Sequence, residues 1–301
     1  MKTFALLVAL FAIASAEWID IDWSQVRPIE EFDHYWERVP AEMQIYRKML
    51  PTQRIVNGQE ATPGQFPYQI ALLSTFPTGS GLCGGSVLTN NFILSAAHCV
   101  ISSGTTLASG GTAIIGAHDR TVQEPSQQRI AFTAAGIIPH PGYTSTNLRN
   151  DIAVVRLNSP IVYTDRIQPT RLPGSSDTRQ FGGMMGTVSG FGRTTDTGST
   201  SPVVRYTSNP IMTNADCNVH WSTTQVQAQN VCQTTDGGRS SCNGDSGGPL
   251  TVQDGGRSLQ IGLVSFGAAS SGCSGPMPKV FVRVSFFLDW IQANSDFVAS
   301  P

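Results

Sequence analysis

The sequence predicts an all-β fold, either a sandwich or a pair of barrels, on three observations. From Ile55 onward the apolar residues form short runs rich in Val, Ile, Leu and Phe. Gly, Pro, Asn and Ser separate these runs, as they separate short strands. Only one stretch of this region has helical spacing. Many short strands with turn signals between them are typical of β-sandwiches and β-barrels.

Six segments carry the strongest strand signal in chain order: 87–88, 92–94, 152–157, 186–188, 261–266 and 280–284. The helix expected after them covers 285–294, because Phe287, Leu288 and Ile291 fall on one face. Ser285 is its expected N-cap, since a hydroxyl can accept from an N–H of the first turn. We therefore expect the chain to end on a short helix packed against strands.

The first sixteen residues form a predicted signal peptide, 1–16. Lys2 precedes an apolar run that is too short to span a bilayer, and small residues follow at 14–16. This pattern is typical of export by the secretory pathway, and it predicts a secreted, extracellular protein.

Residues 17–54, which we call the leader, differ from the rest of the chain. The leader holds eight acidic side chains and three of the five tryptophans. Ile29, Phe32 and Trp36 recur at helical spacing until Pro40 interrupts the pattern. The leader is therefore expected to be helical rather than a flexible tail.

The composition excludes several functional classes. Of 301 residues 40% are hydrophobic and only 13% are charged, which excludes a disordered chain. A net charge of −2 offers no basic surface for nucleic acid, and no run after the signal peptide is long enough to cross a membrane. Six cysteines in an exported protein predict three disulfides, with about 15 possible pairings.

The strongest chemical signal is Ser246, which lies in the sequence GDSGGP at 244–249. Glycines on both sides let the backbone turn tightly and expose the hydroxyl. The same pattern fits the nucleophile elbow of α/β-hydrolases, in which Asp and His follow the serine. No histidine follows Ser246, so the elbow is excluded.

Two upstream motifs complete a known order: SAAHC around His98 and NDIA around Asp151. The order His, Asp, Ser is that of the chymotrypsin-like serine proteases, and the chain from Ile55 to about residue 294 resembles that family. Further matches are IVNG at 55–58, CGGS at 83–86 and Pro169. Taken singly, the three residues also fit a core histidine, a strand cap and a turn serine.

The resemblance implies two packed six-stranded antiparallel β-barrels with a C-terminal α-helix. The protease domain would cover 55–301, with the N-terminal barrel at about 55–170 and the C-terminal barrel and helix at about 171–296. The leader at 17–54 would be an activation propeptide.

The resemblance also implies a role for each residue of the motifs. His98 would take the proton of the Ser246 hydroxyl, and Asp151 would orient the imidazole and stabilise its charged form. The backbone N–H groups of Gly244 and Ser246 would form the oxyanion hole. In this family the implied disulfide pairs are Cys83–Cys99, Cys217–Cys232 and Cys242–Cys273.

A zymogen is implied as well. Cleavage between Arg54 and Ile55 would free an α-amino group at Ile55. In this family that ammonium inserts beside the aspartate preceding the nucleophile, here Asp245. A buried carboxylate is costly unless it is paired, so the new ion pair would order the oxyanion hole.

The residues of the primary pocket indicate a preference for large apolar side chains. The resemblance implies that Ser240, six residues before Ser246, is at the pocket floor, where trypsin-like members carry Asp, so basic substrate residues would gain no partner. Gly267 would leave one wall open, and Ser265, Phe266 and Gly267 would pair with the substrate backbone. Lys279 stands where the family usually has Gly. Its ammonium either lies in the pocket or reaches water with its stem packed, and both interpretations stay open.

The expected protein is thus a secreted, digestive serine endopeptidase that hydrolyses proteins and peptides. It would be activated by a trypsin-like protease, regulated by protein inhibitors, and monomeric. No metal, cofactor, nucleic acid or membrane is expected as a partner. Two alternatives remain: a cascade protease with one narrow target, and a secreted binding protein that kept the fold and lost activity.

Overall fold

The computed structural model of the chain describes residues 18–37, 58–102, 104–144, 149–195, 198–268 and 272–301. The predicted signal peptide, Arg54 and Ile55 lie outside these described residues. Within them, no helix has the length and apolar character needed to cross a bilayer.

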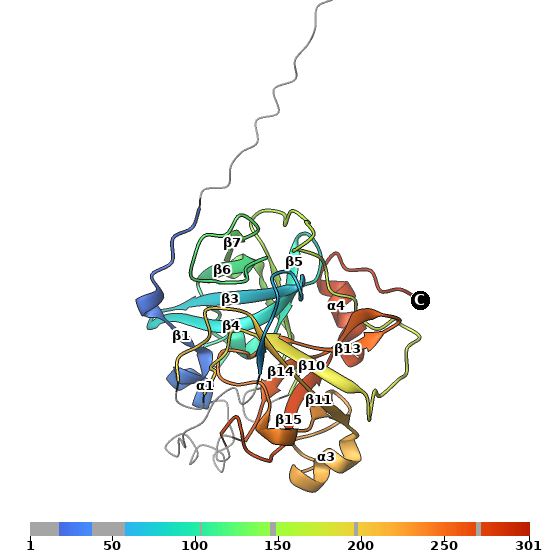
Figure 1. Cartoon of the computed structure of the whole chain (residues 1–301). Coiled ribbons are helices and arrows are strands. Elements are labelled where there is room, and N and C mark those ends of the chain that lie inside the picture. Colours follow the sequence, from blue (N-terminus) through green and yellow to red (C-terminus); the bar gives the residue numbers. More distant parts are fainter. Residues whose placement is uncertain (1–17, 38–57, 103, 145–148, 196–197, 269–271) are drawn as a thin grey trace, which may run out of the picture.

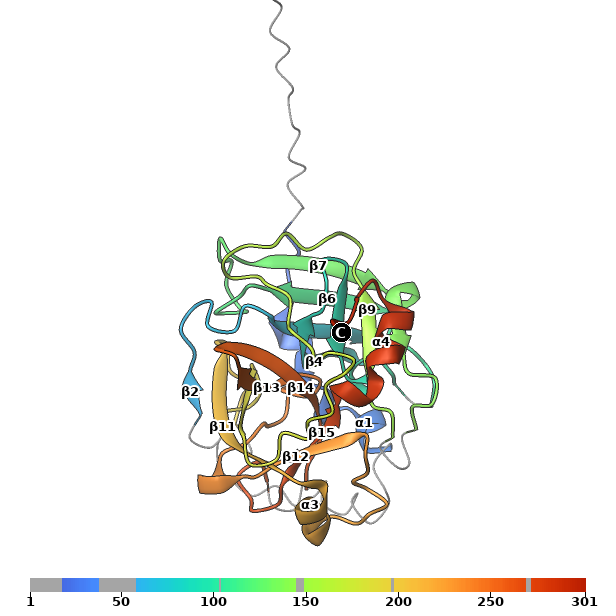
Figure 2. The same ribbon diagram turned by 90° about the vertical axis from the view of Figure 1, so that its right-hand side faces the viewer.

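Two β-sheets form the body of the molecule and lie one above the other in both views (Figures 1 and 2). Among the described residues the N-terminal sheet has eight strands in the order β7-β6-β3-β4-β5-β9-β8, with β1 added beside β4. Its strands are β1 (Val26–Pro28), β3 (Gln69–Phe76), β4 (Gly79–Val87), β5 (Phe92–Ser95), β6 (Gly110–Ile115), β7 (Gln128–Thr133), β8 (Ile137–Pro139) and β9 (Ala153–Arg156).

The C-terminal sheet closes into a six-stranded barrel, because β10 pairs with both β13 and β11. A further strand, β2, pairs with the outer side of β11. The strands of this sheet are β2 (Gln59–Glu60), β10 (Met185–Gly190), β11 (Arg205–Met212), β12 (Asn230–Gln233), β13 (Pro249–Asp254), β14 (Arg257–Phe266) and β15 (Lys279–Arg283). The predicted all-β fold with a C-terminal helix is confirmed, and the C-terminal unit is the expected six-stranded barrel. The N-terminal unit differs from the expected six-stranded antiparallel barrel: among the described residues it is an eight-stranded sheet whose end strands β7 and β8 do not pair with each other, and the leader strand β1 adds to β4 in parallel.

The C-terminal helix starts later than the sequence pattern predicts. A 3-10 turn, η8 (Val284–Phe287), follows β15, and the α-helix α4 covers Leu288–Asn294. The predicted N-cap at Ser285 is wrong: the cap position is Phe287, and no side chain caps the helix. Three residues per turn place Val284 and Phe287 on the same buried side, so core packing favours the tighter turn here. A second helix, α3 (Asn214–His220), was not expected.

Residues 18–37, the described part of the leader, lie against the body, and the helix within them is shorter than the apolar spacing predicts. The strand β1 and the 3-10 turns η1 (Trp23–Gln25) and η2 (Ile29–Glu31) precede a helix, α1, of only five residues (Asp33–Glu37). Figure 1 shows this segment in blue along β4 and the lower part of the molecule. Burial of leader side chains on the body, rather than helical periodicity, decides its path.

Candidate active site

The register of two strands brings His98 and Asp151 together. In the antiparallel pair β5–β9, Ser95 lies opposite Ala153. His98 follows Ser95 by one 3-10 turn, η4 (Ala97–Cys99), and Asp151 precedes Ala153 by two residues. His98 Nδ1 lies 2.8 Å from Asp151 Oδ2, and the His98 backbone N–H donates to Asp151 Oδ1 at 3.0 Å.

Burial strengthens this pair and fixes the ring. Both side chains are fully buried. A carboxylate that accepts at Nδ1 keeps the proton on that nitrogen and leaves Nε2 as the base of the neutral imidazole. The hydroxyl of Ser265, at the end of β14, donates to Asp151 Oδ2 at 2.6 Å. A third strand thus holds the carboxylate in place.

Ser246 lies in a turn that enters β13 and meets the N-terminal sheet. Gly244 and Gly247 have φ angles of 95° and 77°, which L residues with side chains rarely adopt, so the turn depends on glycine there. The Ser246 carbonyl accepts from Gly84 N at 2.8 Å and lies 3.3 Å from the disulfide-bonded Cys99 Sγ. Since Cys99 follows His98 directly, the structure brings the serine to the histidine's end of the site.

A residue of the leader occupies this centre. Glu30 is buried, and its Oε1 accepts from Ser246 Oγ at 2.6 Å while its Oε2 accepts from Gly244 N at 2.9 Å. One carboxylate therefore bridges the predicted nucleophile and a predicted oxyanion donor. Sequence reasoning missed Glu30, because no sequence signal separates it from the seven other acidic residues of the leader.

Asp245 is buried beside the serine. Its carboxylate accepts from Gly192 N at 2.7 Å and from Cys242 N at 2.9 Å. Burial, with a smaller contribution from the negative charge of Glu30, raises the pKa of Asp245 to about 7, although the two N–H donors oppose this. The site therefore holds an acid that would gain from a nearby cation.

Four of the five predicted pocket residues are buried, namely Ser240, Ser265, Phe266 and Lys279. Ser240 is buried, and its hydroxyl donates to the carbonyls of Ser241, at 3.0 Å, and Cys273. Lys279, the first residue of β15, is only 7% exposed and donates from Nζ to the Gly272 carbonyl at 3.4 Å. A Cβ added at Gly267 would lie 2.9 Å from that Nζ. The ammonium thus lies directly against the predicted pocket wall.

Comparisons with known proteins agree with this geometry. The family model described as Trypsin matches residues 55–291. The chain is 36% identical to chymotrypsin from Phaedon cochleariae, over 99% of this chain and 100% of the relative. It is 38% identical to brachyurin from Leptuca pugilator, over 80% and 98% of the two chains.

The chain belongs to the trypsin family of serine proteases. The solved structure of HL collagenase superposes with a TM-score of 0.71 at 34% identity, covering 81% of this chain and 99% of that one. This trypsin-family member is accordingly a serine endopeptidase with the fold that its motifs imply.

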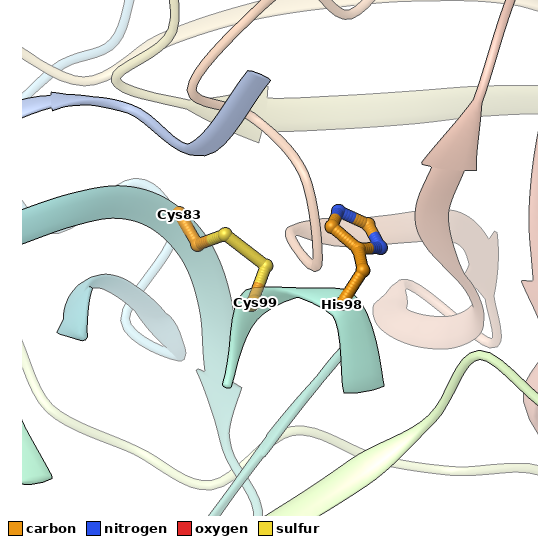
Figure 3. Close-up of side chains that lie close together, drawn as sticks. All are labelled: Cys83, His98 and Cys99. Atoms are coloured by element: carbon orange, nitrogen blue, oxygen red, sulfur yellow. A yellow bond between two sulfur atoms is a disulfide. The ribbon is translucent and has the colours of Figure 1, made fainter. Parts of the chain in front are cut away.

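Three disulfides brace the trypsin-family domain: Cys83–Cys99, Cys217–Cys232 and Cys242–Cys273. These are the pairs that the resemblance implies. Figure 3 shows the first beside His98, where it ties η4 to β4.

Cys83, His98 and Cys99 have metal-ligand atoms within 4.8 Å of one another. Because the two sulfurs are bonded to each other, they offer no thiolate to a metal ion.

Proposed function

We propose that this protein is a secreted zymogen of a serine endopeptidase that uses His98, Asp151 and Ser246. One observation carries the proposal: Ser246 Oγ and Gly244 N both donate hydrogen bonds to the carboxylate of Glu30, and the buried His98–Asp151 pair belongs to the same site. A hydroxyl and an amide that converge on one carboxylate could equally converge on a scissile carbonyl.

The reaction would proceed through an acyl-enzyme. His98 Nε2 accepts the Ser246 proton as Ser246 Oγ bonds to the carbonyl carbon of the substrate. The carbonyl oxygen becomes negative and accepts hydrogen bonds from the backbone N–H groups of Gly244 and Ser246. The same proton passes to the leaving amine as the peptide bond breaks. Water then repeats the sequence on the ester and releases the acid. Asp151, held by Ser265, stabilises the imidazolium in both steps.

Activation would follow cleavage between Arg54 and Ile55. The family match begins at residue 55, which supports this boundary. The freed ammonium would pair with Asp245, whose raised pKa marks a carboxyl in need of a cation. Pairing would favour its charged form and fix the backbone that carries Gly244.

The pocket is expected to accept large apolar side chains and to reject basic ones. Ser240 provides no negative charge at the floor, and the Lys279 ammonium repels Lys and Arg. The position of Nζ against Gly267 favours a second preference, for acidic side chains that could pair with it. A peptide-library cleavage profile distinguishes these preferences, and it also separates broad digestion from the single narrow target of a cascade protease.

A fluorophosphonate probe tests the proposed activity, because it reacts only with an activated serine. After trypsin cleavage, we expect the wild-type chain to be labelled at Ser246, and the His98→Ala and Ser246→Ala variants to stay unlabelled. Absence of labelling in both the cleaved wild type and the cleaved Glu30→Ala variant would favour the alternative of a secreted binding homologue without activity.

A further inference from the structure

The leader meets the active site through a side chain that resembles a reaction product. We propose that residues 18–37 form an inhibitor of their own protease domain, in which the Glu30 carboxylate mimics the product acid, and that this segment stays bound after cleavage at Arg54. The inference rests on the proposed function, since it assigns Ser246 and Gly244 to the reacting centre.

The geometry of Glu30 matches a cleaved peptide. Hydrolysis of a peptide bond leaves a new C-terminal carboxylate on the product. One of its oxygens accepts from the N–H groups of the oxyanion hole, and the other accepts from the serine hydroxyl. Glu30 has this arrangement, with Oε2 2.9 Å from Gly244 N and Oε1 2.6 Å from Ser246 Oγ. Distances of about 2.7 to 3.1 Å are those expected between such a donor and a developing oxyanion. A substrate carbonyl and Glu30 therefore cannot occupy the site together.

The leader is placed as an inhibitor rather than as a substrate. Attack requires a main-chain carbonyl in front of Ser246, but a side chain occupies that position. The carbonyl of Glu30 itself accepts from Trp36 Nε1 at 2.8 Å. That hydrogen bond holds the peptide group of Glu30 within the leader, so the nucleophile meets a carboxylate, which resists attack.

Apolar contacts fix Glu30 in this position. The strand β1 pairs in parallel with residues 80–82 of β4, and Ile29 and Phe32, on either side of the glutamate, are almost completely buried. A Cβ at Gly81 would lie 2.7 Å from Ile29 Cδ1, so Ile29 packs closely on the β4 backbone at this glycine. The Tyr35 ring packs edge-on against His98, with centroids 5.5 Å apart. The leader thus covers the nucleophile and the base together.

Three arginines of the body hold the outer parts of the leader. Arg193 forms an ion pair with Glu31. The Arg129 guanidinium lies 4.0 Å from the Trp18 ring centroid and donates to the Ile19 carbonyl at 2.8 Å. Arg120 lies 4.7 Å from the ring centroid of Trp23. Stacking of a guanidinium on an aromatic ring is favourable, and Arg120 and Arg129 are both buried. Together these contacts extend the bound surface well beyond Glu30.

Retention of the cleaved leader must be noncovalent. All six cysteines pair with one another, and residues 17–54 contain none. Arg27 is followed by Pro28, where trypsin cuts poorly, so activation leaves residues 18–37 as one piece. Binding of a separate piece obeys mass action, and inhibition must therefore weaken on dilution.

The test measures the specific activity of the trypsin-cleaved full chain, without removal of the leader, over about a thousandfold range of protein concentration. We expect the wild type to gain at least about tenfold in specific activity on dilution. Glu30→Ala should have the same specific activity at every concentration, and Glu30→Gln should become inhibited only at concentrations about tenfold to a hundredfold higher than the wild type. Glu37→Gln, the same change at an exposed position of α1, should behave as the wild type.

A synthetic peptide of residues 18–37 provides an independent measurement on wild-type enzyme. Added to the dilute cleaved protein, it should raise KM without changing kcat. The Glu30→Gln peptide should inhibit about tenfold to a hundredfold more weakly, the usual range for loss of charge in a buried hydrogen bond. The Glu37→Gln peptide should retain full potency.

Concentration-independent activity of the cleaved wild type, equal to that of Glu30→Ala, would overturn the inference while leaving the proposed function intact. Equal potency of the Glu30→Gln and unmodified peptides would also overturn it. Absence of activity and of fluorophosphonate labelling in every cleaved protein, Glu30→Ala included, would instead refute the proposed function on which the inference rests.

Discussion

Replacement of Asp245 by Asn should remove a specific pH dependence from the stability of the uncleaved chain. Burial raises the pKa of this carboxyl from 3.8 to about 7. The folded chain therefore keeps a proton that the unfolded chain loses between about pH 4 and pH 7. Stability from this group is complete below about pH 4 and falls as the pH rises to about 7.

The magnitude follows from the two pKa values. Between about pH 5 and pH 7 the wild type should lose about 2 kcal/mol of unfolding free energy through Asp245, and the whole shift corresponds to about 4 kcal/mol. An Asn side chain does not titrate, so the Asp245→Asn variant should lack this slope, whatever its stability at any one pH. Removing the negative charge with Glu30→Gln should lower the pKa of Asp245 in the folded chain, so that the loss of stability is smaller and ends at a lower pH.

Urea unfolding of the uncleaved chain at a series of pH values measures this difference. Asp236→Asn, at an exposed aspartate in η6 (Asp236–Gly238), serves as the control and should follow the wild-type curve. Parallel curves for the wild type and Asp245→Asn between about pH 5 and pH 7 would refute the assignment of a raised pKa to this residue.

Three further changes test other contacts. Ser265→Ala removes a donor to Asp151 and should lower kcat by about tenfold to a hundredfold with little change in KM, while Ser265→Thr retains activity and the wild-type pH profile. Lys279→Gly should raise the turnover of substrates with large aromatic residues, measured as kcat/KM; unchanged kinetics would exclude a role of Lys279 in the pocket. Phe32→Ala should destabilise the uncleaved chain by about 3–5 kcal/mol in urea unfolding, because this ring is almost completely buried.

Local patterns predicted six of the described strands, because each of these buries one or both faces: β4, β5, β9, β10, β14 and β15. The segments 92–94, 186–188 and 261–266 lie within β5, β10 and β14. The C-terminal helix was predicted with its correct buried face, although not with its correct start. Packing of Val284 and Phe287 set that start, and a cap signal at Ser285 could not reveal it.

The leader was the least predictable part. Its apolar residues follow helical spacing. In the structure, however, β4 provides a pairing partner, and this part of the leader forms the strand β1 and the 3-10 turn η2 with Ile29 buried. A short helix is marginal by itself in water, so contacts with the body override its periodicity. The sequence could therefore identify a distinct segment but not where that segment would lie.

By itself the sequence determined the class of chemistry, since histidine, aspartate and serine in that order, each in its own motif, admit few other interpretations. Only the tertiary structure decided that Glu30 reaches Ser246, because the two residues are 216 positions apart. Such a contact depends on strand pairing and burial over the whole surface of β4, and short-range sequence patterns carry no information about it.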